Sequence, residues 1–163
     1  MLIRLKNKDR LNIDEFTFKC SIGKNGLRSK KKEGDLSTPR GTFSIKKLYY
    51  RPDKIKKIDT KIQKIKIKKS MGWCNDPKHK KYNSIINTKY KIKHEKMYRK
   101  DNKYDLIIII DFNLIKPIPF KGSAIFIHLT KNYKATAGCI ALSKNDMLVL
   151  LKLINKKSKI KLN

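Results

Sequence analysis

The stretch that decides the fold is GSAIFIHLTKNYKATAGCIAL, residues 122–142. In it, His128 ends an alternating apolar run, and Cys139 follows after the small residues Ala137 and Gly138. A thiol is a poor nucleophile while it is protonated, and an imidazole within hydrogen-bond reach can take its proton. Backbone N–H groups in a tight turn of small residues can then hold the oxyanion. The stretch therefore predicts a cysteine nucleophile with a histidine base; the alternative is that both side chains only fill buried strands.

This pattern resembles the signature of the L,D-transpeptidase catalytic domain, the YkuD-type family, which is a His at a strand end followed by Ser/Thr-x-Gly-Cys-Ile/Val. The matching residues are His128, Thr136, Gly138, Cys139 and Ile140. The sequence departs from the family where His, Arg and Gly are common, at Ala137, Ala141 and Leu129 respectively. Ala137 keeps the backbone N–H that an oxyanion needs. Ala141, in contrast, removes a guanidinium that is suited to binding a carboxylate.

A second element lies far upstream, in residues 32–43. Its glycines and proline are typical of a surface loop, and an ordinary loop is the local alternative. However, it is similar to the Gly-x-x-x-Thr-Pro-x-Gly-x-Phe element that the L,D-transpeptidases carry before the cysteine. The matching residues are Gly34, Thr38, Pro39, Gly41 and Phe43. Two motifs in the right order extend the resemblance over essentially the whole chain.

The resemblance implies a mainly β (α+β) fold, a YkuD-like β-sandwich of two packed mixed sheets with a C-terminal helix. It implies acyl transfer on peptidoglycan stem peptides, with an L,D-carboxypeptidase or amidase at the same site as the alternative. Cys139 would attack and form a thioester, His128 would act as base, and the backbone at Ala137 and Gly138 would hold the oxyanion. No metal or organic cofactor is needed. The residues assigned to substrate binding are Thr136, Trp73 and Arg40.

Hydrophobic patterning predicts one domain over residues 1–163, with an irregular insertion at about 70–104. The apolar run at 105–112 predicts a strand buried on both faces. In residues 123–129, Ala124, Phe126 and His128 share one face and the intervening residues share the other. A capping box at Ser143 predicts a helix to about residue 155. Other expected strands are at 1–5, 15–23, from 43 onward, within 51–70 and at 159–162.

The formal net charge of +29 would attract polyanions without specificity. Arginine forks and stacking aromatics, which specific nucleic-acid readers use, do not cluster here. The mixture of Lys, Ile and Asn also suits A/T-rich codons, so we expect a solvated basic surface. The rival hypothesis is a basic nucleic-acid or envelope-binding module that kept the fold and lost the activity.

The sequence contains no apolar run long enough to span a membrane. No secretory signal is visible at the N-terminus either. The resemblance points to the cell envelope or periplasm, and the cytoplasm is the alternative. We expect a monomer whose partner is a stem peptide or its precursor.

The three cysteines are widely spaced and form no zinc pattern with the histidines. Alternation in residues 15–23 places Cys20 on a core face, and a disulfide between Cys20 and Cys74 stays open. If His128 meets Cys139, an imidazolium would lower the pKa of the Cys139 thiol.

Overall fold

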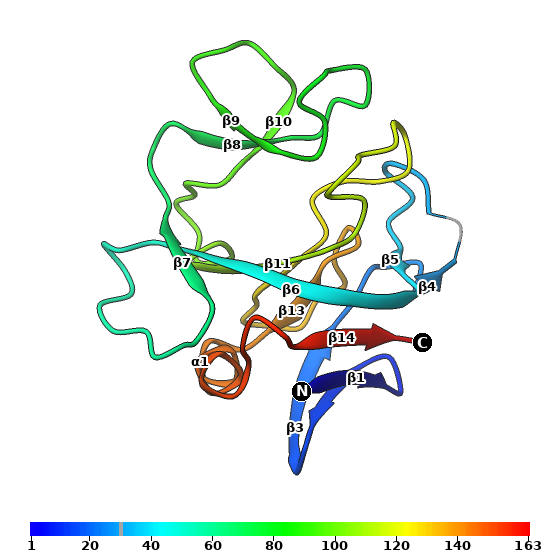
Figure 1. The fold of residues 1–163 in the computed structure, drawn as a ribbon, viewed down its shortest axis with the longest axis vertical. Coiled ribbons are helices and arrows are strands. Elements are labelled where there is room, and N and C mark those ends of the chain that lie inside the picture. Colours follow the sequence, from blue (N-terminus) through cyan, green and yellow to red (C-terminus); the bar gives the residue numbers. More distant parts are fainter. Residues whose placement is uncertain (30) are drawn as a thin grey trace.

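A computed structural model describes residues 1–29 and 31–163. Most of its strands form one sheet, in the order β11-β12-β13-β3-β2-β1-β14-β6, and β6 also pairs with β11 (Figure 1). These eight strands therefore close into a barrel, and β7 adds to β6 as a ninth strand. The bounds in this sheet are β1 Leu2–Lys6, β2 Arg10–Ile13, β3 Phe16–Ser21, β6 Gly41–Tyr50, β7 Gln63–Lys66, β11 Leu106–Ile110, β12 Phe126–Leu129, β13 Ile140–Leu142 and β14 Lys159–Leu162.

The predicted mainly β class is confirmed, but the prediction of two packed sheets is wrong. Sandwiches and closed barrels both alternate inward and outward residues along each strand, so periodicity does not separate them. Closure depends on the ten-residue strand β6. Its residues 41–44 pair with β14, and its residues 45–50 pair with β11. One long strand thus joins the two edges of what would otherwise be an open sheet.

Strand β11 is buried along its whole length, as its apolar run predicts. Leu106, Ile108 and Ile110 belong to the barrel core, whereas Ile107 and Ile109 belong to a second cluster on the opposite face of the strand. We call this second group the outer cluster. Its buried members are Tyr49, Ile67, Trp73, Met97, Tyr104, Ile107, Ile109, Ala124, Phe126 and Cys139.

The segment at β12 divides its side chains in the same way. Ile125, Ile127 and Leu129 pack in the barrel core, and Ala124 and Phe126 pack in the outer cluster. The two faces predicted for residues 123–129 are therefore confirmed. His128 lies in the middle of the sheet, because β12 pairs with β11 on one side and with β13 on the other.

Part of the segment predicted as irregular is a second, three-stranded antiparallel sheet. Its strands are β8 Met71–Cys74, β9 Ile85–Asn87 and β10 His94–Lys96, and it lies at the top of Figure 1, apart from the barrel strands. Buried Arg51 ties this segment to the barrel, because its Nη1 donates to the carbonyl of Arg99 at 2.5 Å. Its guanidinium also lies 3.5 Å from the ring centroid of Tyr98.

The predicted helix is α1 Lys144–Leu153. Ser143 caps it as predicted, because its Oγ accepts from the Asp146 N–H at 3.1 Å. Met147, Leu150 and Leu151 are fully buried in the barrel core. Two short parallel strands complete the fold, β4 Leu27–Arg28 and β5 Thr38–Pro39.

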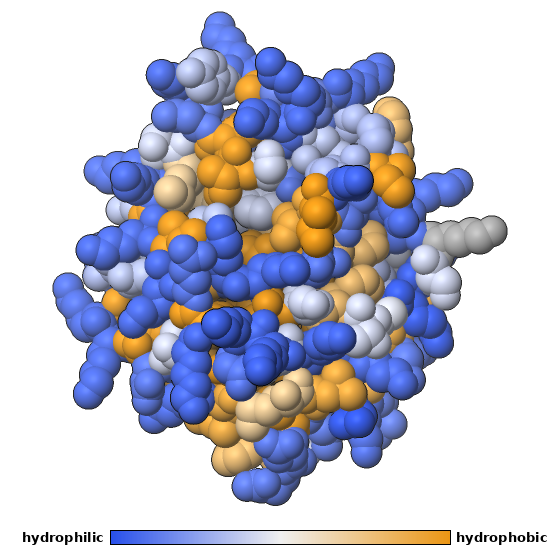
Figure 2. All heavy atoms as spheres, viewed as in Figure 1, coloured by the Kyte–Doolittle hydropathy of each residue, from blue (hydrophilic) through white to orange (hydrophobic). Residues whose placement is uncertain are grey.

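Hydrophilic side chains are spread over the whole of the face that Figure 2 shows, with apolar patches between them. In the described part of the chain, no helix is both long and apolar enough to cross a membrane.

Candidate active site

The structure brings Cys139 and His128 together on neighbouring parallel strands. His128 lies opposite Ala141 in the pairing of β12 with β13, and Cys139 immediately precedes β13. Both side chains line one cavity of about 670 Å³, and both are almost fully buried. The Cys139 Sγ–H donates to the carbonyl of Ala124 at 3.1 Å, and Sγ accepts from the Phe126 N–H at 3.4 Å. The sulfur therefore faces the start of β12, on the side of the outer cluster.

The imidazole of His128 is oriented by a backbone carbonyl. Nδ1 lies 2.9 Å from the oxygen of Leu129, which can only accept, so Nδ1 carries the proton. In the neutral ring, Nε2 then has a free lone pair, as a general base requires. The ring packs edge-on to Tyr104, with 5.4 Å between the centroids.

The pKa values in this pair run opposite to the sequence-based expectation. Burial raises the pKa of the Cys139 thiol to about 12, and the negative charge of Glu95 adds to this. Burial likewise lowers the pKa of His128 to about 4, against the effect of its hydrogen bond to Leu129. Both shifts favour a neutral thiol and a neutral imidazole in the resting site over the expected imidazolium that lowers the thiol pKa.

The turn before Cys139 is held by Thr136. Its Oγ1 accepts from the Gly138 N–H at 3.0 Å and donates to the Cys139 carbonyl at 2.6 Å. Gly138 has a φ of +139°, and a Cβ there would lie 2.6 Å from the carbonyl oxygen of Ser37. Only glycine fits this position without strain. The Gly138 N–H, one of the expected oxyanion donors, is thus already engaged in the turn.

The upstream Thr-Pro motif lies directly against this turn. Thr38 Oγ1 donates to the Gly138 carbonyl at 2.8 Å and accepts from the Gly23 N–H at 2.8 Å. The two motifs that carried the resemblance are therefore one structural unit, although Thr38 and Gly138 are 100 residues apart in the sequence.

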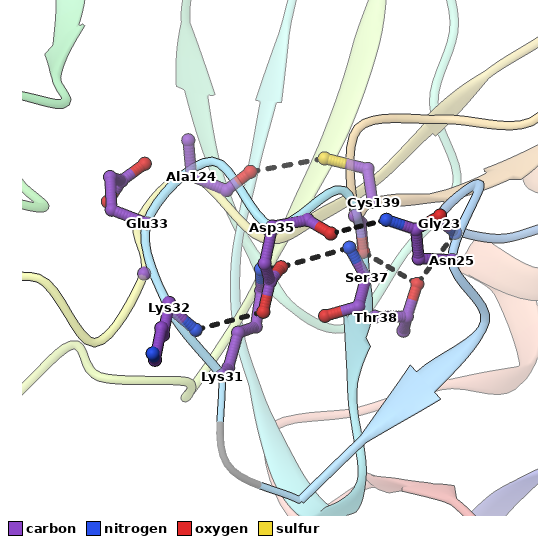
Figure 3. A network of polar contacts seen from close by, with 12 residues as sticks. Gly23, Asn25, Lys31, Lys32, Glu33, Asp35, Ser37, Thr38, Ala124 and Cys139 are labelled. Carbon is purple, nitrogen blue, oxygen red and sulfur yellow. Dashed lines mark hydrogen bonds and ion pairs between the residues drawn. The ribbon is translucent and has the colours of Figure 1, made fainter.

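Asp35 organises the loop that leads into Thr38 (Figure 3). Its carboxylate accepts from Lys31 Nζ at 2.6 Å, from the Lys32 N–H at 2.9 Å and from the Ser37 N–H at 3.0 Å. Burial alone would raise the pKa of Asp35, but these hydrogen bonds outweigh it and hold the pKa well below its usual value. The charged carboxylate thus holds this loop together, and Thr38 at the end of the loop bonds to the cysteine turn.

Asn83 is a structural residue of the site that sequence reasoning did not single out. Its Oδ1 accepts from Trp73 Nε1 at 2.9 Å and from the Ala124 N–H at 3.0 Å. Its Nδ2 donates to the carbonyls of Phe112 at 3.2 Å and Asn113 at 2.6 Å. One buried amide therefore joins the small sheet to the residue whose carbonyl holds the Cys139 thiol. The only signal in the sequence was the Tyr-Asn pair after the tryptophan.

The structure places the three expected substrate-binding residues differently. Thr136 lines the cavity, but its hydroxyl holds the turn. Trp73 is buried in the outer cluster, edge-on to Phe126 at 5.0 Å, and does not line the cavity. Arg40 is exposed and also lies outside the lining. Ala137 is exposed at the cavity. Substrate contacts of these residues stay predictions.

The cavity wall carries many charged side chains, and most of them were not predicted from the sequence as residues of the site. Six cationic side chains line it: Lys31, Arg99, Lys103, Lys131, Lys134 and Lys144. Glu95, from β10, also lines it and accepts a hydrogen bond from the hydroxyl of buried Tyr104. All three cysteines are free. Among the described residues, no group of three or more His, Cys, Asp or Glu side chains is placed to hold a metal ion.

Comparison with known families agrees with this arrangement. The profile of the YkuD family, the L,D-transpeptidase catalytic domain, matches residues 3–162, which is essentially the whole chain. The protein therefore belongs to the L,D-transpeptidase catalytic-domain family. A search of curated proteins found no match.

Proposed function

We propose that the protein is a cysteine acyltransferase of the L,D-transpeptidase type that acts on peptidoglycan stem peptides, with Cys139 as nucleophile and His128 as base. The observation that carries the proposal is the shared cavity, which Cys139 and His128 both line. Its family membership supports the same reaction class. The cell envelope is accordingly the compartment we propose for it.

Because the Cys139 thiol and the His128 imidazole are both neutral at rest, the thiol loses its proton as its sulfur attacks the substrate. As the Cys139 sulfur bonds to the substrate carbonyl carbon, its proton passes to Nε2 of His128. The imidazolium that results is stabilised by the hydrogen bond from Nδ1–H to the Leu129 carbonyl. It then gives the proton to the leaving amine as the C–N bond breaks, which leaves a thioester on Cys139. Since the Gly138 N–H is engaged by Thr136, we assign the oxyanion to the backbone N–H groups of Cys139 and Ala137.

Stem peptides carry carboxylates, and the family arginine that could bind one is replaced by Ala141. The six cationic side chains that line the cavity offer a substitute for this arginine. Arg99 lies on the cavity and makes a bidentate pair with Asp101, at 2.9 and 2.6 Å. Lysines from several segments line the same cavity. We propose that this positive wall attracts the substrate carboxylates by charge, without the fixed geometry of a single guanidinium clamp.

Intact-protein mass spectrometry with a tetrapeptide stem tests the proposal. The wild type is expected to gain the mass of the tripeptide acyl group on Cys139 and to release the terminal D-amino acid. Cys139→Ser should stay folded and lose the adduct and the turnover by roughly a thousandfold or more, because its hydroxyl is far less acidic than a thiol. Turnover by Cys139→Ser near the wild-type rate would overturn the assignment. Release of acyl product to water alone would identify a carboxypeptidase.

A further inference from the structure

One oxygen acceptor on the cavity wall, Oδ1 of Asn75, is buried from solvent and has neither a hydrogen-bond partner nor a counter-charge among the described residues. A second unbonded oxygen, Oδ1 of Asp105, lies 3.1 Å from Lys54 Nζ and so has its counter-charge. Buried polar atoms without partners are costly, and in a cavity they indicate a ligand that donates hydrogen bonds.

Glu95 lies beside Asn75 on the small sheet. In the pairing of β8 with β10, Glu95 is directly opposite Trp73. Asn75 is two residues after Trp73, and side chains alternate between the two faces of a sheet. The side chains of Trp73, Asn75 and Glu95 therefore project from the same face. Residues diagonally opposed in this way are about 7 Å apart, close enough for both to contact one small group.

The carboxylate of Glu95 makes no ion pair among the described residues, although its charge reaches Arg99 and helps to raise the pKa of that guanidinium. None of the six ion pairs found among the described residues includes it, although the cavity wall is rich in lysine. Its one hydrogen-bond partner is the hydroxyl of Tyr104, whose ring packs against His128. Its charge also raises the pKa of Cys139, which supports a position near the sulfur.

Glu95 and Asn75 both line the cavity that holds Cys139. Both groups accept hydrogen bonds, and Glu95 is negatively charged. This set matches an ammonium group, which offers three donors and a positive charge.

We propose that Glu95 and Asn75 form a subsite for the protonated primary amine of the acyl acceptor. The inference rests on the proposed function and assigns its second substrate. The ammonium releases one proton to solvent, and the amine then attacks the thioester carbon. The new C–N bond forms as the C–S bond breaks, and the second amine proton passes through His128 to the departing sulfur. The products are an amide and the free Cys139 thiol. By concentrating amine near the thioester, the subsite favours transfer over hydrolysis.

The test compares two nucleophiles on the same acyl-enzyme. D-alanine amide has an amine pKa of about 8 and is mostly cationic at pH 7, whereas hydroxylamine is uncharged there. Glu95→Gln keeps the shape and an acceptor for Tyr104 but removes the charge. We expect it to lower aminolysis by D-alanine amide, relative to aminolysis by hydroxylamine, by about tenfold, the effect of one charge-assisted hydrogen bond. The KM for D-alanine amide should rise. Asn75→Ala is a second variant and should lower the same ratio.

The matched control is Glu33→Gln. Glu33 also lines the cavity and also accepts a hydrogen bond from a tyrosine hydroxyl, that of Tyr82. Its substitution should leave the ratio of the two nucleophiles unchanged. An unchanged ratio in Glu95→Gln and Asn75→Ala, or an equal change in Glu33→Gln, would overturn the subsite. Acyl-enzyme formation is measured separately by intact mass. Its absence in the wild type would instead overturn the proposed function.

Discussion

In the barrel, Cys139 and His128 are held by strand pairing, with an apolar interior behind them. In the small sheet β8–β10, Glu95 lies on a short strand and Asn75 directly follows another, and the sheet attaches to the barrel through the apolar outer cluster and through polar side chains. Asn83 and Arg51 make the polar attachments, each through hydrogen bonds to backbone groups of a distant segment. The barrel therefore fixes the proposed nucleophile and base by backbone geometry, whereas the small sheet is placed by side-chain packing and a few side-chain hydrogen bonds.

This difference suggests a division of roles between the two regions. The chemistry requires the thiol and imidazole at a fixed separation, which backbone pairing in a closed barrel provides. We propose that the opposite wall recognises the substrate, and an attachment through side chains allows its residues to vary without disturbing the barrel. A substitution at an attachment point should therefore affect the small sheet more than the barrel.

The largest effect on stability is expected from Asn83→Asp. Asn83 is 2% exposed, and the change removes both donors to Phe112 and Asn113 and puts a buried charge beside their carbonyls. We expect the free energy of unfolding to fall by about 3 kcal/mol. Denaturant unfolding followed by Trp73 fluorescence measures this loss. The control is Asn87→Asp, because exposed Asn87 uses its Oδ1 only to accept from Lys89. Equal losses in the two variants would contradict the role of Asn83.

A smaller effect is expected on the barrel side from Thr38→Val. Valine keeps the shape but loses the hydroxyl that joins Gly23 to Gly138. The free energy of unfolding should fall by about 2 kcal/mol, because a buried N–H and a buried carbonyl each lose their partner. Formation of the acyl-enzyme should slow, because the cysteine turn is no longer anchored. Thr42→Val, at an exposed position of β6, is the control. If Thr38→Val acylates Cys139 as fast as the control, the anchoring role is wrong.

The smallest effect is expected in the alkylation of Cys139 without substrate. Because its thiol pKa is raised to about 12, the rate with iodoacetamide should rise steadily with pH and show no plateau below pH 8. The pKa of His128 is lowered to about 4, so its ring carries no positive charge above about pH 5. His128→Ala should therefore leave the alkylation rate within about twofold while it removes acyl transfer. A plateau below pH 8 that disappears in His128→Ala would instead show a thiolate–imidazolium pair.

Cys20 is the internal reference for the alkylation of Cys139. Burial raises its pKa to about 12 as well, but it lies in the barrel core and does not line the cavity. Peptide mapping should find the label on Cys139 well before Cys20, because the two thiols differ in access and not in acidity. Equal labelling would mean that the barrel opens as readily as the cavity admits the reagent.

Much of the fold could be read from local patterns. The apolar run at 105–112, the two faces of 123–129 and the cap at Ser143 each depend on residues close in sequence, so periodicity was enough. The strands Arg10–Ile13 and Ile140–Leu142 were not predicted, because runs of three or four residues seldom show a clear alternation of apolar and polar side chains. The closure of the barrel could not be predicted either, since it depends on which strand edges meet.

By itself the sequence determined the family, the mainly β class and the residues of the Cys139 turn, because short motifs with fixed spacing carry that information. Only the tertiary structure favours a neutral thiol and a neutral imidazole, because burial raises the pKa of Cys139 and lowers the pKa of His128. It alone placed Thr38 beneath Gly138 and Glu95 on the cavity wall. These contacts join residues tens of positions apart, and neither charge nor spacing along the chain encodes which distant groups will share a low-dielectric site.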